Sequence, residues 1–250
     1  MQHADDRRIE GAGTPEADWI GLEALPAVAP DELIAQGQRA VIVAPHPDDE
    51  ILACGGLMLR LLEARRAVLL VAVTDGAGSH PGSRLWPPER LARERPRESR
   101  EALQRLGAGA VSVQRLGLSD TRVAAQARRL QAWLEDFLRS DDVIVTTWRG
   151  DGHPDHEACG RVCAQAAQSI GCGLLETPVW AWHWSWPGDP RVPWQRARRT
   201  VLTPDQLAAK CAAIEAHSSQ LGEDASTGRG PVLPATALAR LLRPFEVVLQ

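Results

Sequence analysis

The sequence predicts an α/β fold in which helices cover both faces of a mainly parallel β-sheet. Short apolar, β-branched runs alternate along the 250 residues with longer segments whose apolar residues recur at helical spacing. The runs are continuously apolar rather than alternating with polar residues, as expected for strands that are buried on both faces. No internal repeat or linker-like stretch interrupts this order, so we expect a single domain over residues 29–250.

The first part of the chain leads into two of the expected strands. Residues 1–28 are polar and rich in Gly, Pro and acidic side chains, which predicts an extension that lies over the surface or is partly disordered. Pro30 is expected at the start of a short helix, where proline is favoured. The apolar runs 40–44 and 68–73 are expected strands, and the apolar spacing between them predicts a helix over 49–65.

The rest of the chain follows the same rules. A loop rich in Gly, Ser and Pro is expected over 76–88 and a helix over 93–106. Pro96 cannot donate a backbone hydrogen bond, so it predicts a kink or a fresh start that leaves Arg95 at a helix boundary. The further expected strands are 111–114, 143–147, 200–202 and 245–249, and the further expected helices are 121–139, 155–169 and 204–217.

Composition argues against several classes of function. A net charge of -4 without a long basic run argues against nucleic acid as the main partner. No apolar stretch approaches the roughly 20 residues that span a bilayer, and the polar N-terminus lacks the apolar core of a signal peptide. The cysteines are odd in number and form no C-x-x-C pair, which favours a cytoplasmic protein over a disulfide framework. They are Cys54, Cys159, Cys163, Cys172 and Cys211.

Two short segments combine histidine with aspartate. Residues 45–50, Pro-His-Pro-Asp-Asp-Glu, follow one predicted strand, and residues 153–156, His-Pro-Asp-His, follow another; each precedes a predicted helix. Because the carboxyl ends of parallel strands meet at one edge of a sheet, we expect the two segments to lie together. Histidine and aspartate supply the nitrogen and oxygen ligands that suit zinc, and an open zinc site is typical of a hydrolase.

Helix capping is the alternative explanation for these segments. An aspartate at a helix start caps free N–H groups and interacts favourably with the helix dipole, which would account for Asp49 or Asp155 alone. Capping does not explain three histidines at the same two turns. Cys159, one turn after His156, is more simply a small buried thiol than a further ligand.

Residues 44–50 resemble the signature of the PIG-L/LmbE-type zinc-dependent N-acetylglucosaminyl deacetylases, and residues 152–156 resemble the second motif of that family. The order and spacing of the predicted strands fit the family over roughly residues 38–220. The resemblance implies a Rossmann-like three-layer sandwich. It also implies a metal-dependent amide hydrolase that removes an N-acyl group, expected to be N-acetyl, from a small-molecule amino sugar or sugar conjugate.

The resemblance further implies a role for each residue of the two motifs. The implied zinc ligands are His46, Asp49 and His156. Ferrous iron is an alternative to Zn2+, because histidine and carboxylate ligands accept either metal. Asp48 would be the general base that takes a proton from water, and His153 would stabilise the oxyanion or act as an acid, with Asp155 holding it in the required charge state.

Two further segments resemble family motifs near the substrate. Arg95 begins an Arg-x-x-Glu segment and would reach toward the substrate, although it could equally be a solvated arginine. His217 lies in a His-Ser-Ser-Gln segment that follows Lys210 and resembles a weaker C-terminal motif near the pocket, although a histidine near a helix C-terminus is also favourable for the helix dipole alone. Some family members carry a tyrosine two residues before the first histidine of the second motif, but that position is Asp151 here, and the chain has no tyrosine. Either His153 and zinc stabilise the oxyanion alone, or another group substitutes.

Four tryptophans alternate with other residues over 180–186, within a segment 174–186 that we expect to be extended. On a strand, all four indoles would face one way. Such a face would be packed core or the interface of a homo-oligomer. Alternatively, it would be a stacking platform for a sugar or an apolar tail, with Trp184 contacting the substrate.

Two other functions remain as alternatives to the deacetylase, and a nucleotide-binding oxidoreductase is discounted. One is an amidase of a larger sugar–thiol or lipid conjugate, and another is a catalytically impaired protein that binds zinc or sugar. The retention of Asp48, which is not a ligand in the family, argues against the impaired protein. A nucleotide-binding oxidoreductase would need a G-x-G-x-x-G segment after the first strand, where residues 45–50 stand instead.

Overall fold

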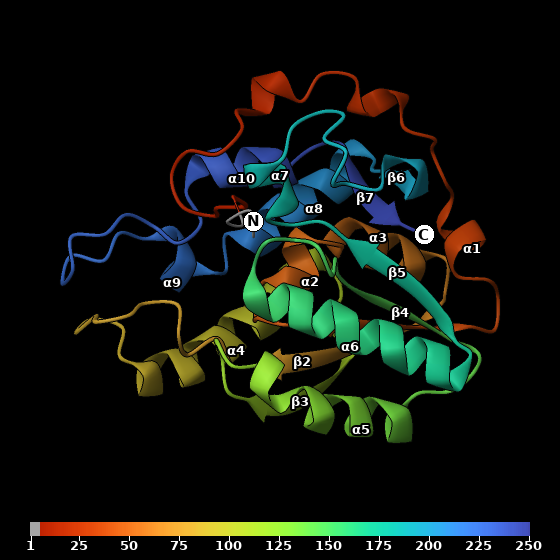
Figure 1. Cartoon of the computed structure of the whole chain (residues 1–250), viewed down its shortest axis with the longest axis horizontal. Helices are drawn as coiled ribbons and strands as arrows, with labels where there is room; N and C mark the ends of the chain where they lie inside the picture. Colours follow the sequence, from red (N-terminus) through yellow and green to blue (C-terminus); the bar gives the residue numbers. More distant parts are fainter. Residues whose placement is uncertain (1–5) are drawn as a thin grey trace, which may run out of the picture.

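The computed structural model describes residues 6–250, which are built around a seven-stranded sheet (Figure 1). The strands follow the order β3-β2-β1-β4-β5-β7-β6. Neighbours from β3 to β5 pair in parallel, whereas β7 pairs antiparallel with both β5 and β6. The strands are β1 (Arg39–Ala44), β2 (Ala67–Thr74), β3 (Ser112–Leu118), β4 (Asp142–Thr147), β5 (Gly173–Thr177), β6 (Ala197–Val201) and β7 (Phe245–Leu249).

Helices cover both faces of the sheet (Figure 1). Successive residues of β1 face opposite sides: Val41 and Val43 pack with α5 and α6, whereas Ile42 and Ala44 pack with α3, α4 and α8. This arrangement confirms the predicted Rossmann-like three-layer sandwich. The helices are α1 (Pro30–Leu33), α2 (Asp49–Leu52), α3 (Gly55–Glu63), α4 (Pro88–Leu106), α5 (Ala127–Phe137), α6 (Pro154–Ile170), α7 (Ala181–Trp184), α8 (Pro204–Ile214), α9 (Ser218–Leu221) and α10 (Ala235–Leu241).

The strand order switches between β1 and β4 at the centre of the sheet. From β1 the chain moves outward through β2 to β3, and from β4 it moves outward on the other side to β5. Open α/β sheets bind their ligands at the carboxyl ends of the strands that flank such a switch. The two histidine–aspartate segments follow β1 and β4, so the topology places them at this position.

Several helix boundaries differ from the sequence prediction. The expected helix 49–65 is two helices, α2 and α3, because the carboxylate of Glu246 caps a new N-terminus by accepting from the N–H groups of Gly56 and Leu57 at 2.8 and 2.7 Å. The expected boundary at Pro96 is wrong: α4 runs from Pro88 to Leu106, and Arg95 lies inside it. Packing of the buried face of α4 offsets the hydrogen bond that proline removes.

Three other elements are shorter or shifted. In place of the helix 121–139, a turn precedes a short 3-10 helix, Ala124–Gln126, and then α5. The helix expected over 204–217 ends at Ile214, and the strand expected at 200–202 is β6, which lies earlier. Residues 6–28 are not only a surface extension, because Trp19 and Leu22 are buried in the core.

The extended tryptophan segment is the clearest error of the sequence prediction. Only Gly173–Thr177 is a strand; after it the chain turns at Pro178 and forms the short helix α7. The four indoles therefore do not share a face: Trp182 is buried against Trp19 with ring centroids 5.0 Å apart, whereas Trp186 is 49% exposed. The face on which we based the predicted homo-oligomer does not exist.

In the part of the chain that the structure describes, no helix combines the length and the apolar character needed to cross a bilayer.

Candidate active site

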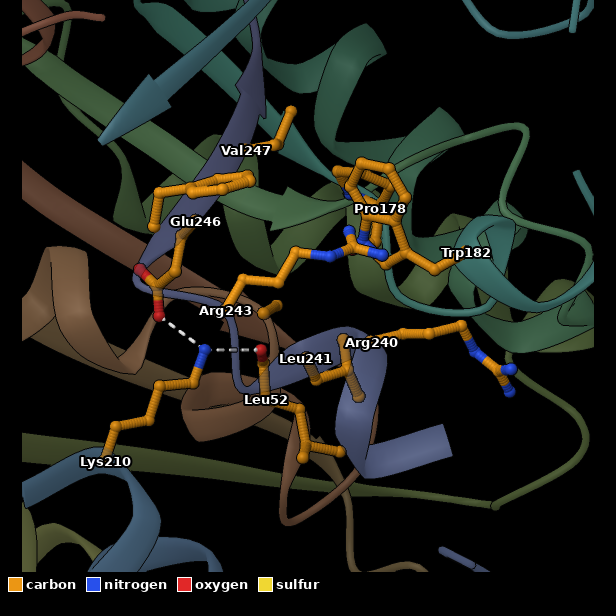
Figure 2. Close-up of a pocket in the computed structure, with 11 residues that line it drawn as sticks. Leu52, Pro178, Trp182, Lys210, Arg240, Leu241, Arg243, Glu246 and Val247 are labelled. Carbon is orange, nitrogen blue, oxygen red and sulfur yellow. Dashed lines mark hydrogen bonds and ion pairs between the residues drawn. The ribbon is translucent and has the colours of Figure 1, made fainter. Parts of the chain in front are cut away.

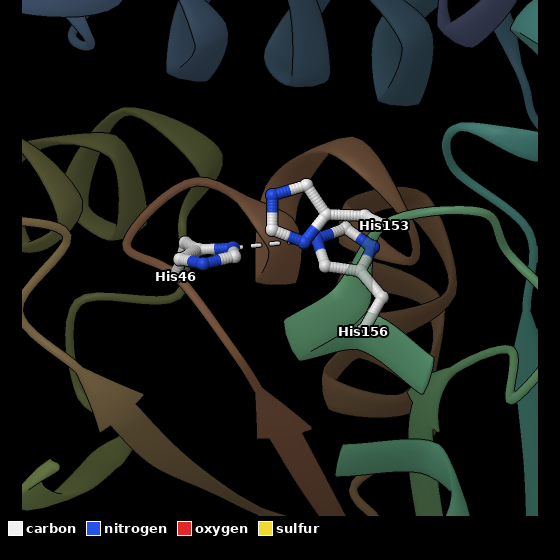
Figure 3. Close-up of side chains that lie close together, drawn as sticks. All are labelled: His46, His153 and His156. Atoms are coloured by element: carbon white, nitrogen blue, oxygen red, sulfur yellow. Dashed lines mark hydrogen bonds between the residues drawn. The ribbon is translucent and has the colours of Figure 1, made fainter. Parts of the chain in front are cut away.

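The candidate active site lies where β1 and β4 end. His46 lies in the turn between β1 and α2, Asp49 is the first residue of α2, and His156 lies in the first turn of α6. Figure 3 shows the imidazoles of His46 and His156 directed toward one another, with His153 beside them. The side chains of His46 and His156 are buried, and that of His153 is partly buried. The ring centroid of His153 lies 4.9 Å from that of His46 and 4.6 Å from that of His156.

Three side-chain atoms form a nearly equilateral triangle. His46 Nδ1 lies 3.2 Å from Asp49 Oδ2 and 3.3 Å from His156 Nε2, and the latter two atoms are 3.2 Å apart. Ligand atoms around a tetrahedral zinc ion at about 2.0–2.1 Å would be about 3.3–3.4 Å from one another. Two imidazoles and one carboxylate at this spacing therefore fit a metal ion. His153 also has a ring nitrogen within 4.8 Å of the two other histidines, so it borders the same position.

Carboxylates hold the outer nitrogens of both ligand-like histidines. His46 Nε2 lies 3.2 Å from Asp120 Oδ1 and 3.5 Å from Asp155 Oδ2. His156 Nδ1 lies 2.8 Å from Asp151 Oδ2. A carboxylate on the outer nitrogen fixes the ring and leaves the inner nitrogen free for a metal, which is the usual arrangement around metal-binding histidines.

The sequence reasoning missed these roles of Asp120 and Asp151. Asp120 follows the carboxyl end of β3, the same edge of the sheet as the two motifs, and that position was the available signal. Asp151 was noted only as the residue that stands where some relatives carry a tyrosine.

The charges of the cluster favour a cation at its centre. Burial alone would lower the pKa of His46 and His156, but the surrounding carboxylates outweigh it: the pKa of His46 is well above its usual value, and that of His156 is raised to about 9. Burial would likewise raise the pKa of Asp49, yet the two histidines hold it well below its usual value. Asp49 is thus an anion, and the carboxylates around the two histidines favour positive charge at this position, which a bound cation could supply in place of the imidazole protons.

Asp48 and Arg95 form a buried ion pair beside the triangle. Arg95 Nη2 donates to Asp48 Oδ2 at 2.9 Å, and Arg95 Nη1 donates to the carbonyl oxygen of Gly76 at 3.0 Å. Burial raises the pKa of Asp48 to about 6, although the Arg95 guanidinium opposes the shift. A carboxyl with this pKa can exchange a proton near neutral pH. Arg95 contacts Asp48 rather than lying solvated on the helix surface.

His153 presents a defined hydrogen-bonding face. It is the N-cap residue of α6, and its Nδ1 accepts from the backbone N–H of Asp155 at 3.2 Å. Burial, aided by the charges of His156 and His46, lowers its pKa to about 2, so the ring is neutral. Since Nδ1 is an acceptor, the ring proton is assigned to Nε2, which can donate a hydrogen bond.

The carboxylate of Asp155 serves other partners than the sequence suggested. It accepts from the backbone N–H groups of Thr121 and Val123 at 2.7 and 3.1 Å and lies 3.5 Å from His46 Nε2. Its contact with His153 is made through its backbone N–H. Asp155 therefore orders the first histidine and the chain after β3.

The C-terminal motif reaches the site through α4. Glu98, one turn after Arg95, accepts from Ser218 Oγ, Ser219 N and Ser219 Oγ at 2.6–2.8 Å and holds the turn that carries His217. His217 is fully buried, and burial followed by the Arg95 charge lowers its pKa to about 3. It is a neutral imidazole; among the described residues neither ring nitrogen has a hydrogen-bond partner.

Lys210, in contrast, belongs to the core and lies outside the triangle. Figure 2 shows its ammonium group between Glu246 and the end of α2, where it donates to Glu246 Oε1 at 2.7 Å and to the carbonyl oxygen of Leu52 at 3.0 Å. The same Glu246 caps α3. This buried ion pair links strand β7 to helices α2 and α8.

Trp184 packs against the second motif. Its Nε1 donates to the carbonyl oxygen of Asp151 at 2.7 Å, and its ring stacks on Trp148 at a centroid distance of 6.4 Å. Arg191 lies over the indole at 4.6 Å. A Cβ at Gly152 would come within 2.7 Å of Nε1, so the loop before His153 and this indole are in direct contact.

The α/β sandwich places a buried histidine–carboxylate triangle, which has the spacing to hold a metal ion, at its topological switch and next to a carboxyl that can exchange a proton. The sequence model of the PIG-L family, described as GlcNAc-PI de-N-acetylase, matches residues 41–167. This region contains both motifs, and the chain belongs to that family. A curated relative, an uncharacterized deacetylase called YaiS from Escherichia coli, is 30% identical over 144 residues, which cover 54% of this chain and 72% of the relative.

Solved structures support the fold. The N,N'-diacetylchitobiose deacetylase from Pyrococcus horikoshii superposes with a TM-score of 0.60 at 18% identity, covering 82% of this chain and 78% of that one. The A40926 pseudoaglycone deacetylase Dbv21 superposes with a TM-score of 0.58 at 18% identity, covering 85% and 96%. The family membership, rather than these structures, makes this protein a PIG-L-type deacetylase, a class of hydrolase that acts on amides.

Proposed function

We propose that this protein is a zinc-dependent hydrolase that removes an N-acetyl group from an amino sugar or a conjugate carrying one. The triangle of His46, Asp49 and His156 is the observation that carries the proposal, because its spacing fits a small metal ion. The buried Asp48–Arg95 pair beside it adds a group suited to proton transfer. The family membership supplies the reaction class.

His46 Nδ1, Asp49 Oδ2 and His156 Nε2 would hold the ion. When bound, zinc supplies Lewis acidity, which polarises a carbonyl group and lowers the pKa of water toward neutrality. Fe2+ is compatible with the same donor set.

Asp48 would act as the general base. Arg95 engages Oδ2, so Oδ1 is the oxygen that would accept a proton from the attacking water. The same carboxyl would later deliver that proton to the departing nitrogen, and the products are acetate and a free amine.

His153 would act as the oxyanion donor. With Nδ1 occupied by the N–H of Asp155, its Nε2–H would donate to the oxygen that becomes negative in the tetrahedral intermediate. A neutral imidazole can provide this contact without gaining or losing a proton.

The proposed substrate class rests on the family and on named relatives. The family description, GlcNAc-PI de-N-acetylase, names an N-acetylglucosamine conjugate as the substrate. Similar structures bear the names of deacetylases of a chitobiose derivative and of a pseudoaglycone. These names support an N-acylated amino sugar, free or conjugated. Trp184 and His217 would border the substrate, as expected from the sequence.

The test is amine release from a panel of N-acetylated amino sugars and their larger conjugates. It would be measured on the protein as isolated, after chelation, and after zinc or Fe2+ is restored, with Asp48→Asn as the variant that lacks the base. Release that disappears on chelation, returns with one metal and is lost in Asp48→Asn supports the proposal. Turnover of conjugates alone would favour the amidase alternative, and a metal-loaded protein that releases no amine would contradict the proposal.

A further inference from the structure

Asp151 is a fully buried carboxylate whose hydrogen bonds connect two parts of the site. Oδ2 contacts His156 Nδ1 at 2.8 Å and accepts from Trp180 N at 3.0 Å. Oδ1 accepts from Val179 N at 2.8 Å and from Ala181 N at 3.0 Å. One side chain therefore accepts from four N–H groups, and it is 0% exposed.

The three backbone donors come from the segment that turns away from β5. They are the N–H groups at the start of α7, which a helix leaves without internal partners. The backbone carbonyl of Asp151 also accepts from Trp184 Nε1 at the end of α7. Asp151 thus anchors both ends of this short helix and the indole that packs on the second motif.

From these contacts we propose that Asp151 is a positioning residue that couples the ligand His156 to the Trp184-bearing segment 179–184. The inference rests on the proposed function, because it takes His156 as a metal ligand. Asp151 fixes the proton of His156 on Nδ1, and this leaves the Nε2 lone pair directed at Asp49 and His46 for the metal. The same carboxylate holds residues 179–181, and the backbone carbonyl of Asp151 holds Trp184, against the loop that carries His153.

Replacing Asp151 by asparagine is the sharpest test. Asparagine offers one acceptor oxygen and one NH2 donor where aspartate offers two acceptors, so in either orientation a donor group faces N–H groups. In one orientation the NH2 group faces the N–H groups of His156 and Trp180. In the other it faces the N–H groups of Val179 and Ala181. We expect Asp151→Asn to bind zinc about 10- to 100-fold more weakly, as measured by competition with a chromogenic chelator. We also expect faster hydrogen exchange of the amides of residues 179–181.

Glu176→Gln is the matched control. Glu176 is also a fully buried carboxylate, but it pairs with Arg149 and Arg196 and contacts no histidine of the site. Its neutralisation tests the general cost of removing a buried charge next to β4, and zinc affinity should remain that of the wild type. Asp151→Asn with wild-type zinc affinity would overturn the inference.

A second measurement covers the case in which Asp151→Asn fails to fold. In the zinc-loaded wild-type protein, nitrogen-15 NMR should show a slowly exchanging proton on Nδ1 of His156. A zinc complex in which that proton is absent from Nδ1 would also overturn the inference. The two hypotheses fail differently: a wild-type protein that binds no zinc contradicts the proposed function, whereas zinc binding that ignores Asp151 contradicts only this inference.

Discussion

The protonation of Asp48 depends on two opposing influences, burial and the neighbouring guanidinium of Arg95. Arg95 is itself buried at 3% exposure and makes a forked contact, with one nitrogen on Asp48 and another on Gly76. The fork matters because it fixes which carboxylate oxygen is engaged and which is left for a proton. Arg95 would therefore act through Asp48, as a positioning residue, rather than through a direct contact with substrate.

Arg95→Lys distinguishes positioning of Asp48 from direct binding of the substrate. Lysine keeps the charge but lacks the planar fork, so it cannot hold Asp48 and the Gly76 carbonyl in the same geometry. We expect kcat to fall by about 10-fold or more while KM and zinc content change little. Arg97→Lys, on the exposed side of α4 where Arg97 pairs with Glu94, should leave both constants unchanged. A large rise in KM at constant kcat would instead support the substrate-binding role that the sequence suggested.

At the scale of the element, α4 carries two motif side chains that serve different parts of the site. Arg95 reaches the turn after β1, and Glu98 holds the turn that begins α9 and carries His217. The Arg-x-x-Glu and His-Ser-Ser-Gln segments, which looked like separate motifs in the sequence, are thus connected through helix α4. Because α4 also packs extensively on α8, the position of this helix sets the position of both turns.

Glu98→Ala tests whether Glu98 stabilises the turn that carries His217. The change leaves the N–H of Ser219 and two serine hydroxyls without their acceptor in a largely buried location. We expect the free energy of unfolding to fall by about 1–3 kcal/mol in urea titrations, with greater protease sensitivity at residues 217–221. Glu94→Ala removes only an exposed pair with Arg97 and should cost about 0.5 kcal/mol or less. Equal effects of the two changes would contradict the role assigned to Glu98.

Local sequence patterns predicted the strands and most of the helices, because buried parallel strands are continuously apolar and helices keep their spacing. The errors occur where distant side chains decide the backbone. The tryptophan segment bends because Asp151, 28 to 30 positions earlier, accepts its N–H groups. The helix after β1 is divided because Glu246 caps α3 from β7. Neither contact has a signature in the local sequence.

The sequence predicted part of the candidate site, as it predicted part of the fold. The two motifs gave the three corners of the triangle, and their spacing along the chain allowed the topology to be inferred. Two of the carboxylates behind the histidines, Asp120 and Asp151, were not found, since they belong to no local pattern of metal ligation. Their roles arise only when the sheet brings the carboxyl ends of β1, β3 and β4 to the same edge, in the order β3-β2-β1-β4.

At the scale of the whole molecule, the triangle joins elements far apart in the chain. His46 and Asp49 follow β1, whereas His156 begins α6, more than one hundred residues later. An ion at this position would bind the folded chain and not the unfolded one, so it should stabilise the entire sandwich. At a free zinc concentration of about 100 times Kd, the gain is about 2.7 kcal/mol.

For a chain of this size, that gain corresponds to a rise in Tm of roughly 5–10 °C between chelated and zinc-loaded protein. The measurement is thermal unfolding followed by circular dichroism at several zinc concentrations. Asp49→Ala, which removes one corner of the triangle, should unfold at a temperature that no longer depends on zinc. Mg2+, which prefers six oxygen ligands, should produce no comparable rise. A wild-type Tm that is indifferent to zinc, or an Asp49→Ala variant that responds as the wild type does, would show that the triangle is not where the ion binds.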